Sequence, residues 1–197
     1  TFIGTVSPAG GNLKEPVTES TKKAARCFYA LAQARADKKR YPAVDPVDSY
    51  SKYLEYPEIV EYLQNRVDKD WVNKVNRAKT IIRRGKEVYE QINILGDDGV
   101  PISYHEMYWK SELIDFVILQ QDAFDPIDSV TPMDRQEFML SLVLNICDKS
   151  FTFETFEDCS AKFKEIINIM RQMNYSEFKS EQFNKYFEQV NKILSDE

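Results

Sequence analysis

The residue pattern between positions 67 and 95 places the strongest constraint on the fold of this chain. Its apolar residues recur at intervals of three and four, the spacing that puts side chains on one face of an α-helix. They are Val67, Trp71, Val75, Ala78, Ile82, Val88, Tyr89, Ile92 and Leu95. At 1.5 Å per residue, such a helix would be about 40 Å long. The pattern therefore predicts one long amphipathic helix.

The residues after this helix predict a turn and a returning helix. The sequence Gly-Asp-Asp-Gly-Val-Pro occupies positions 96–101, and it stops a helix because glycine suits a helix C-terminus and proline cannot continue one. Ser103 and Glu106 have the spacing of a capping box, which predicts that the second helix begins there. We expect a helical hairpin with an acidic tip at 95–106. The acidic residues of this tip are Asp97, Asp98 and Glu106.

Three further helices are indicated downstream. The sequence Thr-Pro-Met-Asp at 131–134 is typical of a helix start, with threonine as cap and proline in the first helical position. Apolar stripes then predict this helix and two more, at about 157–173 and 180–194. Residues 48–197 are therefore predicted to form a mainly α domain, a C-terminal helical bundle.

The first part of the chain, residues 1–47, has a different character. It holds three of the six glycines, a turn-forming cluster at 7–12 and an apolar run at 24–32, which together favour two strands with connecting loops. Two strands alone do not make a stable sheet. The chain also opens without methionine in an apolar run at 2–6. We therefore expect 1–47 to be the incomplete edge of a sheet-containing domain, cut from a larger protein.

Composition narrows the possible partners and surroundings. The 26 Lys and Arg against 32 Asp and Glu give a net charge of -6, which argues against nucleic acid as a partner. No apolar stretch approaches the roughly 18 residues of a membrane span, and the first residues lack a basic region followed by an apolar one, the pattern of a signal peptide. The three cysteines, Cys27, Cys147 and Cys159, form no disulfide framework or zinc motif. These features favour a soluble chain in the cytoplasm.

The usual motifs of catalysis are missing from the sequence. The only Gly-Lys pair, Gly85-Lys86, lacks the upstream glycine of a phosphate-binding loop and is followed by Glu87. The single histidine, His105, has no cysteine or second histidine at metal-ligand spacing, and we expect it to be solvated or to cap the turn. We therefore assign no catalytic residue and no metal ligand in this chain.

Two short segments contain an aromatic residue in an unusual setting. Residues 40–49 place Tyr41 beside two prolines that stiffen the backbone. Residues 119–126 place Phe124 in a polar helix end that a proline stops. Considered separately, each aromatic is more typical of ordinary packing.

The two segments gain meaning from a family resemblance. Three motifs, Ser-Pro-Ala-Gly-Gly at 7–11 leading into Glu-Pro-Val-Thr at 15–18, Tyr-Pro-Ala-Val-Asp-Pro at 41–46, and Leu-Gln-Gln-Asp-Ala-Phe at 119–124, occur in a familiar order and at a familiar spacing. With them the chain resembles the C-terminal part of the catalytic A subunit, also called alpha, of V/A-type rotary ATPases and ATP synthases. The middle motif also resembles a run in the F-type β subunit.

The resemblance implies a place in a rotary machine. Alternating A and B subunits would form a ring around a central stalk, and ATP or ADP with Mg would couple to proton or sodium transport, with the membrane contacted only indirectly. The phosphate-binding loop would lie upstream, so that residues 1–47 would be the last strands of an α/β nucleotide-binding domain. The isolated chain would then be inactive and would hold no nucleotide tightly.

The same resemblance implies roles for the two segments and for the hairpin. Tyr41 and Phe124 would line the adenine pocket, where an aromatic face stacking on a base is worth about 1 to 3 kcal/mol. The hairpin tip would face the central stalk, where Asp97, Asp98 and Glu106 would meet basic residues and tune register more than affinity. A solvated turn is the alternative interpretation of this tip.

Some positions depart from the family pattern. Many archaeal members have F-W-A-L-D where this chain has Phe28–Ala32, and R-R-H-F-P-A-I where it has Lys38–Val44, which favours a bacterial branch.

Two other hypotheses compete with this resemblance. One competing hypothesis is a free-standing helical interaction module without a nucleotide role. The other is the non-catalytic B subunit, against which the Gln-Gln-x-Ala-Phe segment argues.

Overall fold

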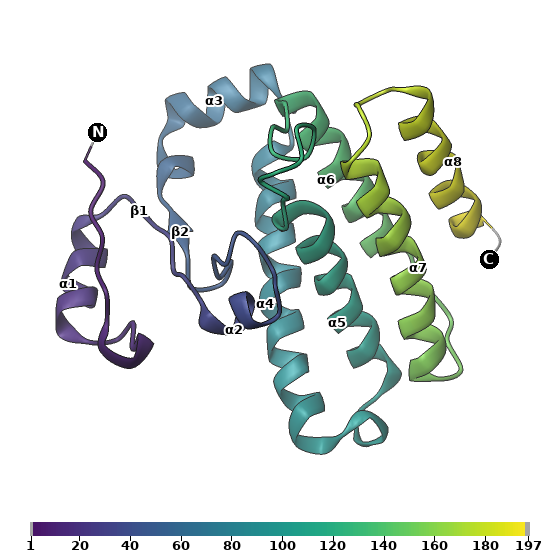
Figure 1. Cartoon of the computed structure of the whole chain (residues 1–197), viewed down its shortest axis with the longest axis horizontal. Helices are drawn as coiled ribbons and strands as arrows, with labels where there is room; N and C mark the ends of the chain where they lie inside the picture. The colour runs from purple at the N-terminus through teal and green to yellow at the C-terminus, as the bar shows by residue number, and fades with distance from the viewer. Residues whose placement is uncertain (1, 196–197) are drawn as a thin grey trace.

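The computed structural model describes residues 2–195, most of which lie in helices (Figure 1). The helices and strands of this part are, in chain order, α1 (Pro16–Ala24), β1 (Cys27–Phe28), α2 (Gln33–Asp37), β2 (Tyr50–Ser51), α3 (Pro57–Arg66), α4 (Trp71–Leu95), α5 (Ile102–Ile114), α6 (Met133–Asp148), α7 (Phe156–Asn174) and α8 (Glu181–Ser195). Short 3-10 turns occur at Ala9–Gly11, Tyr53–Glu55 and Asp97–Gly99, and a π-helical turn occurs at Asp115–Leu119. The mainly α fold class is confirmed.

The hairpin of α4 and α5 runs through the middle of the molecule, between the N-terminal part and helices α6 to α8 (Figure 1). Helix α4 ends at Leu95 because Gly96 adopts φ 80°, a conformation that glycine reaches without strain. Inside α4, Gly85 is buried against Ser111 of α5, where a Cβ on the glycine would lie 2.1 Å from the Ser111 Cβ. The glycine in the apolar stripe therefore lets the two helices approach closely.

The predicted hairpin is confirmed, but the predicted capping box is wrong. Helix α5 begins at Ile102 after Pro101, whose extended backbone provides the N-cap without a side-chain hydrogen bond. Because the helix starts earlier, Ser103 already lies inside its first turn. A similar one-residue shift occurs at α6, where Pro132 is the cap and Met133 the first helical residue.

The core lies between the hairpin and the three C-terminal helices. Helix α7 packs on α5 and on α8, and it begins at the cap Thr155, whose Oγ1 accepts a hydrogen bond from the Asp158 N–H at 3.1 Å. The predicted helices at 157–173 and 180–194 are confirmed as α7 and α8. The largest fully buried side chains of this core include Phe163, Phe183, Leu113, Ile114 and Ile146.

The two strands predicted within residues 1–47 are largely wrong. Residues 2–8 have no regular structure, and the following segment forms helix α1 because Pro16 occupies the first turn and Lys22 and Lys23 the last, where their charge suits the helix dipole. Among residues 2–47, the two-residue strand β1 pairs antiparallel with β2, which lies beyond residue 47, and Leu31 forms an isolated antiparallel bridge with Val44.

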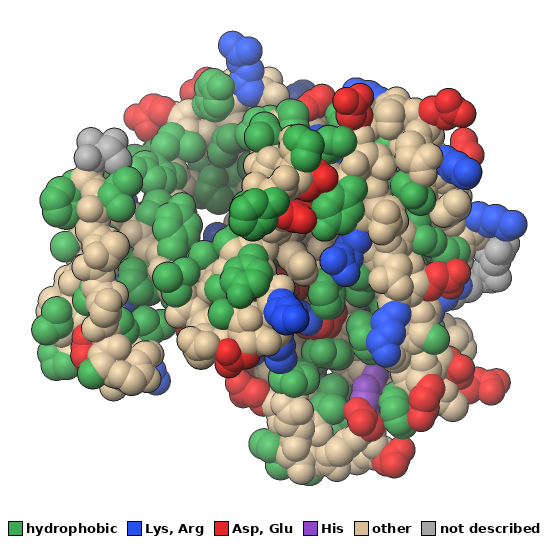
Figure 2. All heavy atoms as spheres, viewed as in Figure 1, with side chains coloured by type: hydrophobic (Ala, Val, Ile, Leu, Met, Phe, Trp, Pro, Cys, Tyr) green, Lys and Arg blue, Asp and Glu red, His purple; other side chains and the backbone are tan. Residues whose placement is uncertain are grey.

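The N-terminal part leaves apolar side chains at the surface. It lies at the side of the bundle away from α8, and hydrophobic side chains gather on it in the space-filling view (Figures 1 and 2). Phe2, Ile3, Tyr29 and Leu31 are among its exposed residues. Within residues 2–195, no helix combines the length and the apolar character needed to cross a bilayer.

Candidate functional site

The two aromatic segments lie side by side at one end of α5. The Gln121 N–H donates a hydrogen bond to the Tyr41 carbonyl oxygen at 2.9 Å. A cleft of about 620 Å³ opens at this junction. Its walls include Tyr41, Pro42, Phe116, Gln120, Phe124 and Arg171. The structure therefore brings Tyr41 and Phe124, singled out separately in the sequence, to the same cleft.

Both aromatic rings are open to a ligand. Tyr41 is 53% exposed and Phe124 is 98% exposed, which is rare for a phenylalanine in an ordered loop. Phe124 owes its position to a turn in which the Asp122 Oδ1 accepts a hydrogen bond from the Phe124 N–H at 2.9 Å. The ring is thus held at the rim of the cleft by its backbone and not by side-chain packing.

The loop that carries Phe124 is fixed by a buried carboxyl group. Asp128 is 6% exposed, and its Oδ2 accepts a hydrogen bond from the Asp122 N–H at 2.6 Å. Burial raises the pKa of Asp128 and outweighs the hydrogen bond from the Asp122 N–H and the charge of Arg135, which both lower it. The negative charges of Asp125 and Asp122 add to the rise. Asp125 in turn accepts hydrogen bonds at 2.8 Å from two backbone N–H groups of the same loop.

One amide oxygen on the wall of the cleft is left without a donor. The Oε1 of Gln120 is buried and makes no hydrogen bond within the described part of the chain. A buried acceptor without a donor is costly, so a ligand that brings an N–H group to this point would relieve that cost. Arg171 adds a positive charge to the same cleft.

The arrangement suits the binding of a flat aromatic ligand. It combines two exposed aromatic rings, an unpaired amide acceptor and a guanidinium group, which can stack on, hydrogen bond with and attract a planar anionic molecule. Among residues 2–195, no group of three or more His, Cys, Asp or Glu side chains is placed to hold a metal ion.

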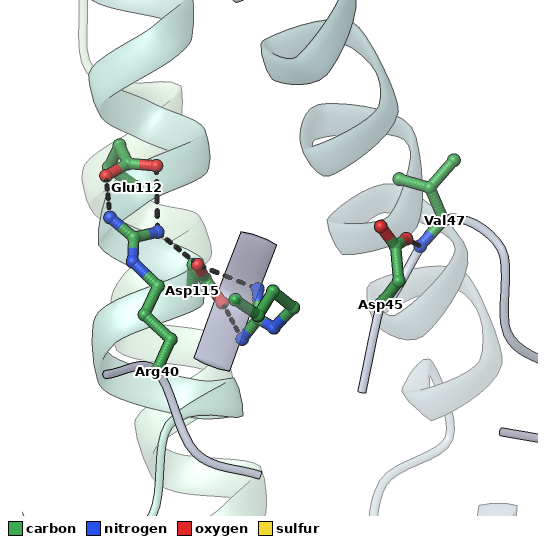
Figure 3. A network of polar contacts seen from close by, with 6 residues as sticks. Arg40, Asp45, Val47, Glu112 and Asp115 are labelled. Atoms are coloured by element: carbon green, nitrogen blue, oxygen red, sulfur yellow. Dashed lines mark hydrogen bonds and ion pairs between the residues drawn. The ribbon is translucent and has the colours of Figure 1, made fainter. Parts of the chain in front are cut away.

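Sequence reasoning missed the buried ion pairs that hold the Tyr41 segment (Figure 3). The guanidinium of Arg40 donates to both carboxylate oxygens of Glu112, at 3.1 and 2.5 Å, and also to Asp115. Arg35 donates to both oxygens of Asp115, at 3.0 and 2.7 Å. The spacing of Glu112 and Asp115 on one helix face was the available signal, but nothing local indicated their partners.

The charge on Arg40 is strongly favoured at this place. Burial acts to lower the pKa of Arg40, but the hydrogen bonds and negative charges of Glu112 and Asp115 outweigh it and raise the pKa. Burial also raises the pKa of Tyr108, helped by the nearby charge of Glu112. The guanidinium of Arg40 therefore keeps its positive charge in spite of its burial.

The hairpin tip lies at the opposite end of α5 from the cleft. The Asp97 side chain is 58% exposed and Asp98 is also exposed, whereas Glu106 pairs with Lys110 at 2.6 Å. Of the two roles expected for His105, solvation is wrong, whereas its contact with the turn agrees with the expected cap. His105 is 4% exposed, its Nε2 lies 3.0 Å from the Asp97 carbonyl oxygen, and its ring stacks on Phe156 of α7 at 5.3 Å.

The helical domain that carries the cleft is similar to a domain of ATP synthases. Residues 61–155 match the family described as the C-terminal domain of V and A type ATP synthase. This match agrees with the resemblance that the three motifs predict.

Its relatives include V-type ATP synthase alpha chains from several bacteria. That of Chlamydia abortus is 39% identical over 194 residues, and those of Chlamydia pneumoniae and Protochlamydia amoebophila are each 38% identical. Each match covers 98% of this chain and 32% of the relative, so the chain spans about a third of the length of these proteins.

A solved structure shows the same fold at a greater sequence distance. The ATP synthase subunit NeqB from Nanoarcheaum equitans superposes with a TM-score of 0.51 at 16% identity, covering 72% of this chain and 32% of that one. This likeness concerns the fold alone.

Proposed function

We propose that the chain is part of the catalytic alpha subunit of a V-type ATP synthase or ATPase. In this role it would help to couple ATP synthesis or hydrolysis to proton or sodium transport, as a cytoplasmic component that meets the membrane only through other subunits. Its partners would be B subunits of the ring and the central stalk, and the nucleotide, with Mg, would be ATP or ADP. Support comes from the similarity of 98% of the chain to alpha chains.

Within that subunit, the cleft between Tyr41 and Phe124 would receive the adenine. One observation carries this assignment: two exposed aromatic rings from distant segments line one cleft, and a backbone hydrogen bond joins their segments. A base stacked on such rings gains about 1 to 3 kcal/mol, or about a tenfold to a hundredfold in affinity. Gln120 would accept a hydrogen bond from the exocyclic amine of the base.

Substitutions in the full-length subunit, assembled in its complex, test the assignment. Tyr41→Ala and Phe124→Ala should each raise the Kd for ATP by about tenfold or more. Tyr41→Phe and Phe124→Tyr should keep the affinity within about twofold, because they keep the aromatic face. Tyr62→Ala removes another exposed aromatic, on α3, and serves as the matched control. Unchanged ATP affinity in both alanine variants would refute the adenine assignment.

The isolated 197-residue chain provides a separate test of its place in the subunit. A chain that supplies only the adenine side of a nucleotide site lacks the phosphate contacts that chemistry requires. We therefore expect no ATP hydrolysis and no tight nucleotide binding by this chain alone. Robust turnover by the purified chain would contradict the proposal.

The acidic tip of the hairpin would face the rotating stalk. Asp97 and Asp98 are exposed there, while Glu106 is already paired with Lys110, so the two aspartates are the better candidates for contact with basic residues. Rim charges of this kind act mainly on register and on the rate of encounter. Asp97→Asn with Asp98→Asn should therefore change the salt dependence of rotation-coupled hydrolysis more than its maximal rate.

A further inference from the structure

The residue beside Tyr41 is locked to the hairpin by a buried, two-pronged contact. Arg40 pairs with Glu112 near the end of α5, donating at 3.1 and 2.5 Å, and with Asp115 in the π-helical turn (Figure 3). Its guanidinium also lies 4.3 Å from the centre of the Phe116 ring, a wall of the cleft. Arg40 therefore contacts the hairpin and the cleft wall at once, one residue from Tyr41.

The ion pairs of Arg40 with Glu112 and Asp115 are strong because these charges are shielded from water. The side chains of Arg40, Glu112 and Asp115 are 14%, 13% and 9% exposed. Arg35, 12% exposed, completes a set of two guanidinium groups and two carboxylates. Removing one partner of such a buried set leaves an uncompensated charge and is far more disruptive than losing a surface ion pair.

The other arm of the hairpin is attached to the same segment more weakly. Lys86 of α4 lies 3.5 Å from Asp45 and 3.6 Å from Asp48. The Asp45 Oδ1 accepts a hydrogen bond from the Val47 N–H at 2.8 Å (Figure 3) and another from the Asp48 N–H at 2.9 Å, which hold the carboxylate in place for this contact. Because Lys86 is 43% exposed, its ion pairs with the segment contribute less than the buried ion pairs of Arg40 do.

The hairpin itself is tight enough to move as one body. Gly85 of α4 meets Ser111 of α5 without room for a Cβ, and Ser111 directly precedes Glu112. Close-packed helices of this kind shift together and do not deform gradually. A displacement of Glu112 and Asp115 would therefore displace Arg40, and with it the Tyr41 backbone that Gln121 holds.

We propose that Arg40 is a positioning residue that couples occupancy of the Tyr41 cleft to the position of the α4–α5 hairpin. The inference rests on the proposed function, because it takes the cleft as the adenine site and the hairpin as the stalk-facing element. Its new content is that the coupling passes through the Arg40–Glu112–Asp115 contact. Arg40 touches neither the base nor a reacting atom in this scheme.

The test compares two ion-pair networks in the full-length subunit, assembled in its complex. Arg40→Met removes the proposed coupling contact. Lys74→Met is the matched control, because Lys74 bridges Asp68 and Glu137, at 2.5 and 2.8 Å, on another part of α4 and is 21% exposed. Two quantities are measured: the Kd for ATP, and the number of ions transported per ATP hydrolysed.

Arg40→Met should raise the Kd for ATP about tenfold, as expected for one buried charge-assisted contact, and should lower the ions transported per ATP at least about twofold. Lys74→Met should lower the unfolding temperature but leave both quantities unchanged. Arg40→Lys should be intermediate, because an ammonium keeps the charge but not the bidentate geometry. Should Arg40→Met fail to assemble, Arg40→Lys and Glu112→Gln give the same two readouts.

A merely structural role for Arg40 gives a different pattern. In that case Arg40→Met and Lys74→Met would lower stability alike and leave the ion-to-ATP ratio of each complex at the wild-type value, and the inference would be wrong. The proposed function fails separately, if Tyr41→Ala leaves the Kd for ATP unchanged. If Tyr41→Ala raises the Kd for ATP while Arg40→Met changes neither the Kd nor the number of ions transported per ATP, the proposed function stands and only the coupling through Arg40 is wrong.

Discussion

The Gln121 N–H donates a hydrogen bond to the carbonyl oxygen of Tyr41 at 2.9 Å, and both residues line the cleft. The preceding residue, Gln120, lines the same cleft with an amide oxygen that lacks a donor. The two side chains of the Gln-Gln pair therefore differ, because the Gln121 side chain donates to the Asp128 carbonyl at 3.1 Å whereas the Gln120 Oε1 has no donor.

This arrangement predicts how the site distinguishes bases. ATP carries an amino group where ITP carries an oxygen, so only ATP can donate to the Gln120 Oε1. Gln120→Leu in the assembled full-length subunit should raise the Kd for ATP by about fivefold to tenfold, the worth of one hydrogen bond. The Kd for ITP should change by less than about twofold. Competition binding with the two nucleotides measures this difference. Equal losses for ATP and ITP would show that Gln120 does not contact the amine.

Most of the correct predictions about the fold came from apolar residues that recur at the spacing of an α-helix. The stripe from Val67 to Leu95 predicted α4 to within a few residues, since a long amphipathic run has few other ways to bury its apolar face. The N-terminal part was misjudged because its apolar residues remain exposed, as Tyr29 and Leu31 show. The spacing of apolar residues predicts secondary structure only where one face of the element is buried, and these residues are not buried.

The site was predictable in one respect and hidden in another. The motif resemblance singled out Tyr41 and Phe124, and both line one cleft. The Arg40 network stayed hidden because its partners are distant in sequence and a charged residue beside a lysine pair usually lies in solvent. The burial of His105 was missed for the same reason: it comes from Phe156 of α7, a contact that no local pattern indicates.

The contact between Gly85 and Ser111 predicts the cost of a single methyl group. In Gly85→Ala the new Cβ would lie 2.1 Å from the Ser111 Cβ and 2.3 Å from its Oγ, so α4 and α5 must separate. Overpacking of this kind should lower the free energy of unfolding by about 1–3 kcal/mol. Chemical denaturation followed by circular dichroism measures the loss.

A second substitution serves as the control for this contact. Gly85→Ala combined with Ser111→Gly removes both clashing atoms and leaves the Ser111-position Cα 3.6 Å away, an ordinary contact. The double variant should therefore regain most of the loss, less about 0.5–1 kcal/mol for a glycine within α5. A Gly85→Ala variant as stable as the wild type would contradict the predicted close approach.

The cysteines should differ sharply in reactivity. Cys147 and Cys159 are buried, and burial raises the pKa of each thiol to about 12. At pH 8 the reactive thiolate would then be about one part in ten thousand. Cys27 is half-buried, so iodoacetamide at pH 8 should modify Cys27 first, as mapped by mass spectrometry. All three should react in denaturant, and rapid modification of Cys159 in the folded chain would contradict this prediction.

The buried carboxyl group of Asp128 predicts a pH-dependent stability. Burial raises the pKa of Asp128 above its unfolded value near 3.8, so the folded chain binds a proton more tightly than the unfolded chain does. The stability linked to this proton is therefore fully present below pH 3.8, and it is lost as the pH rises through the folded pKa. Asp128→Asn keeps an oxygen to accept from the Asp122 N–H but carries no charge to bury.

The variant should thus have a higher Tm than the wild type at pH 7, and the difference should shrink as the pH falls towards 3.8. Asp98→Asn, at the exposed hairpin tip, is the matched control and should show no such trend. Thermal unfolding at a series of pH values measures both variants against the wild type. A lower Tm for Asp128→Asn at pH 7 would mean that the ionised carboxylate, through its attraction to Arg135, stabilises the Phe124 loop despite its burial.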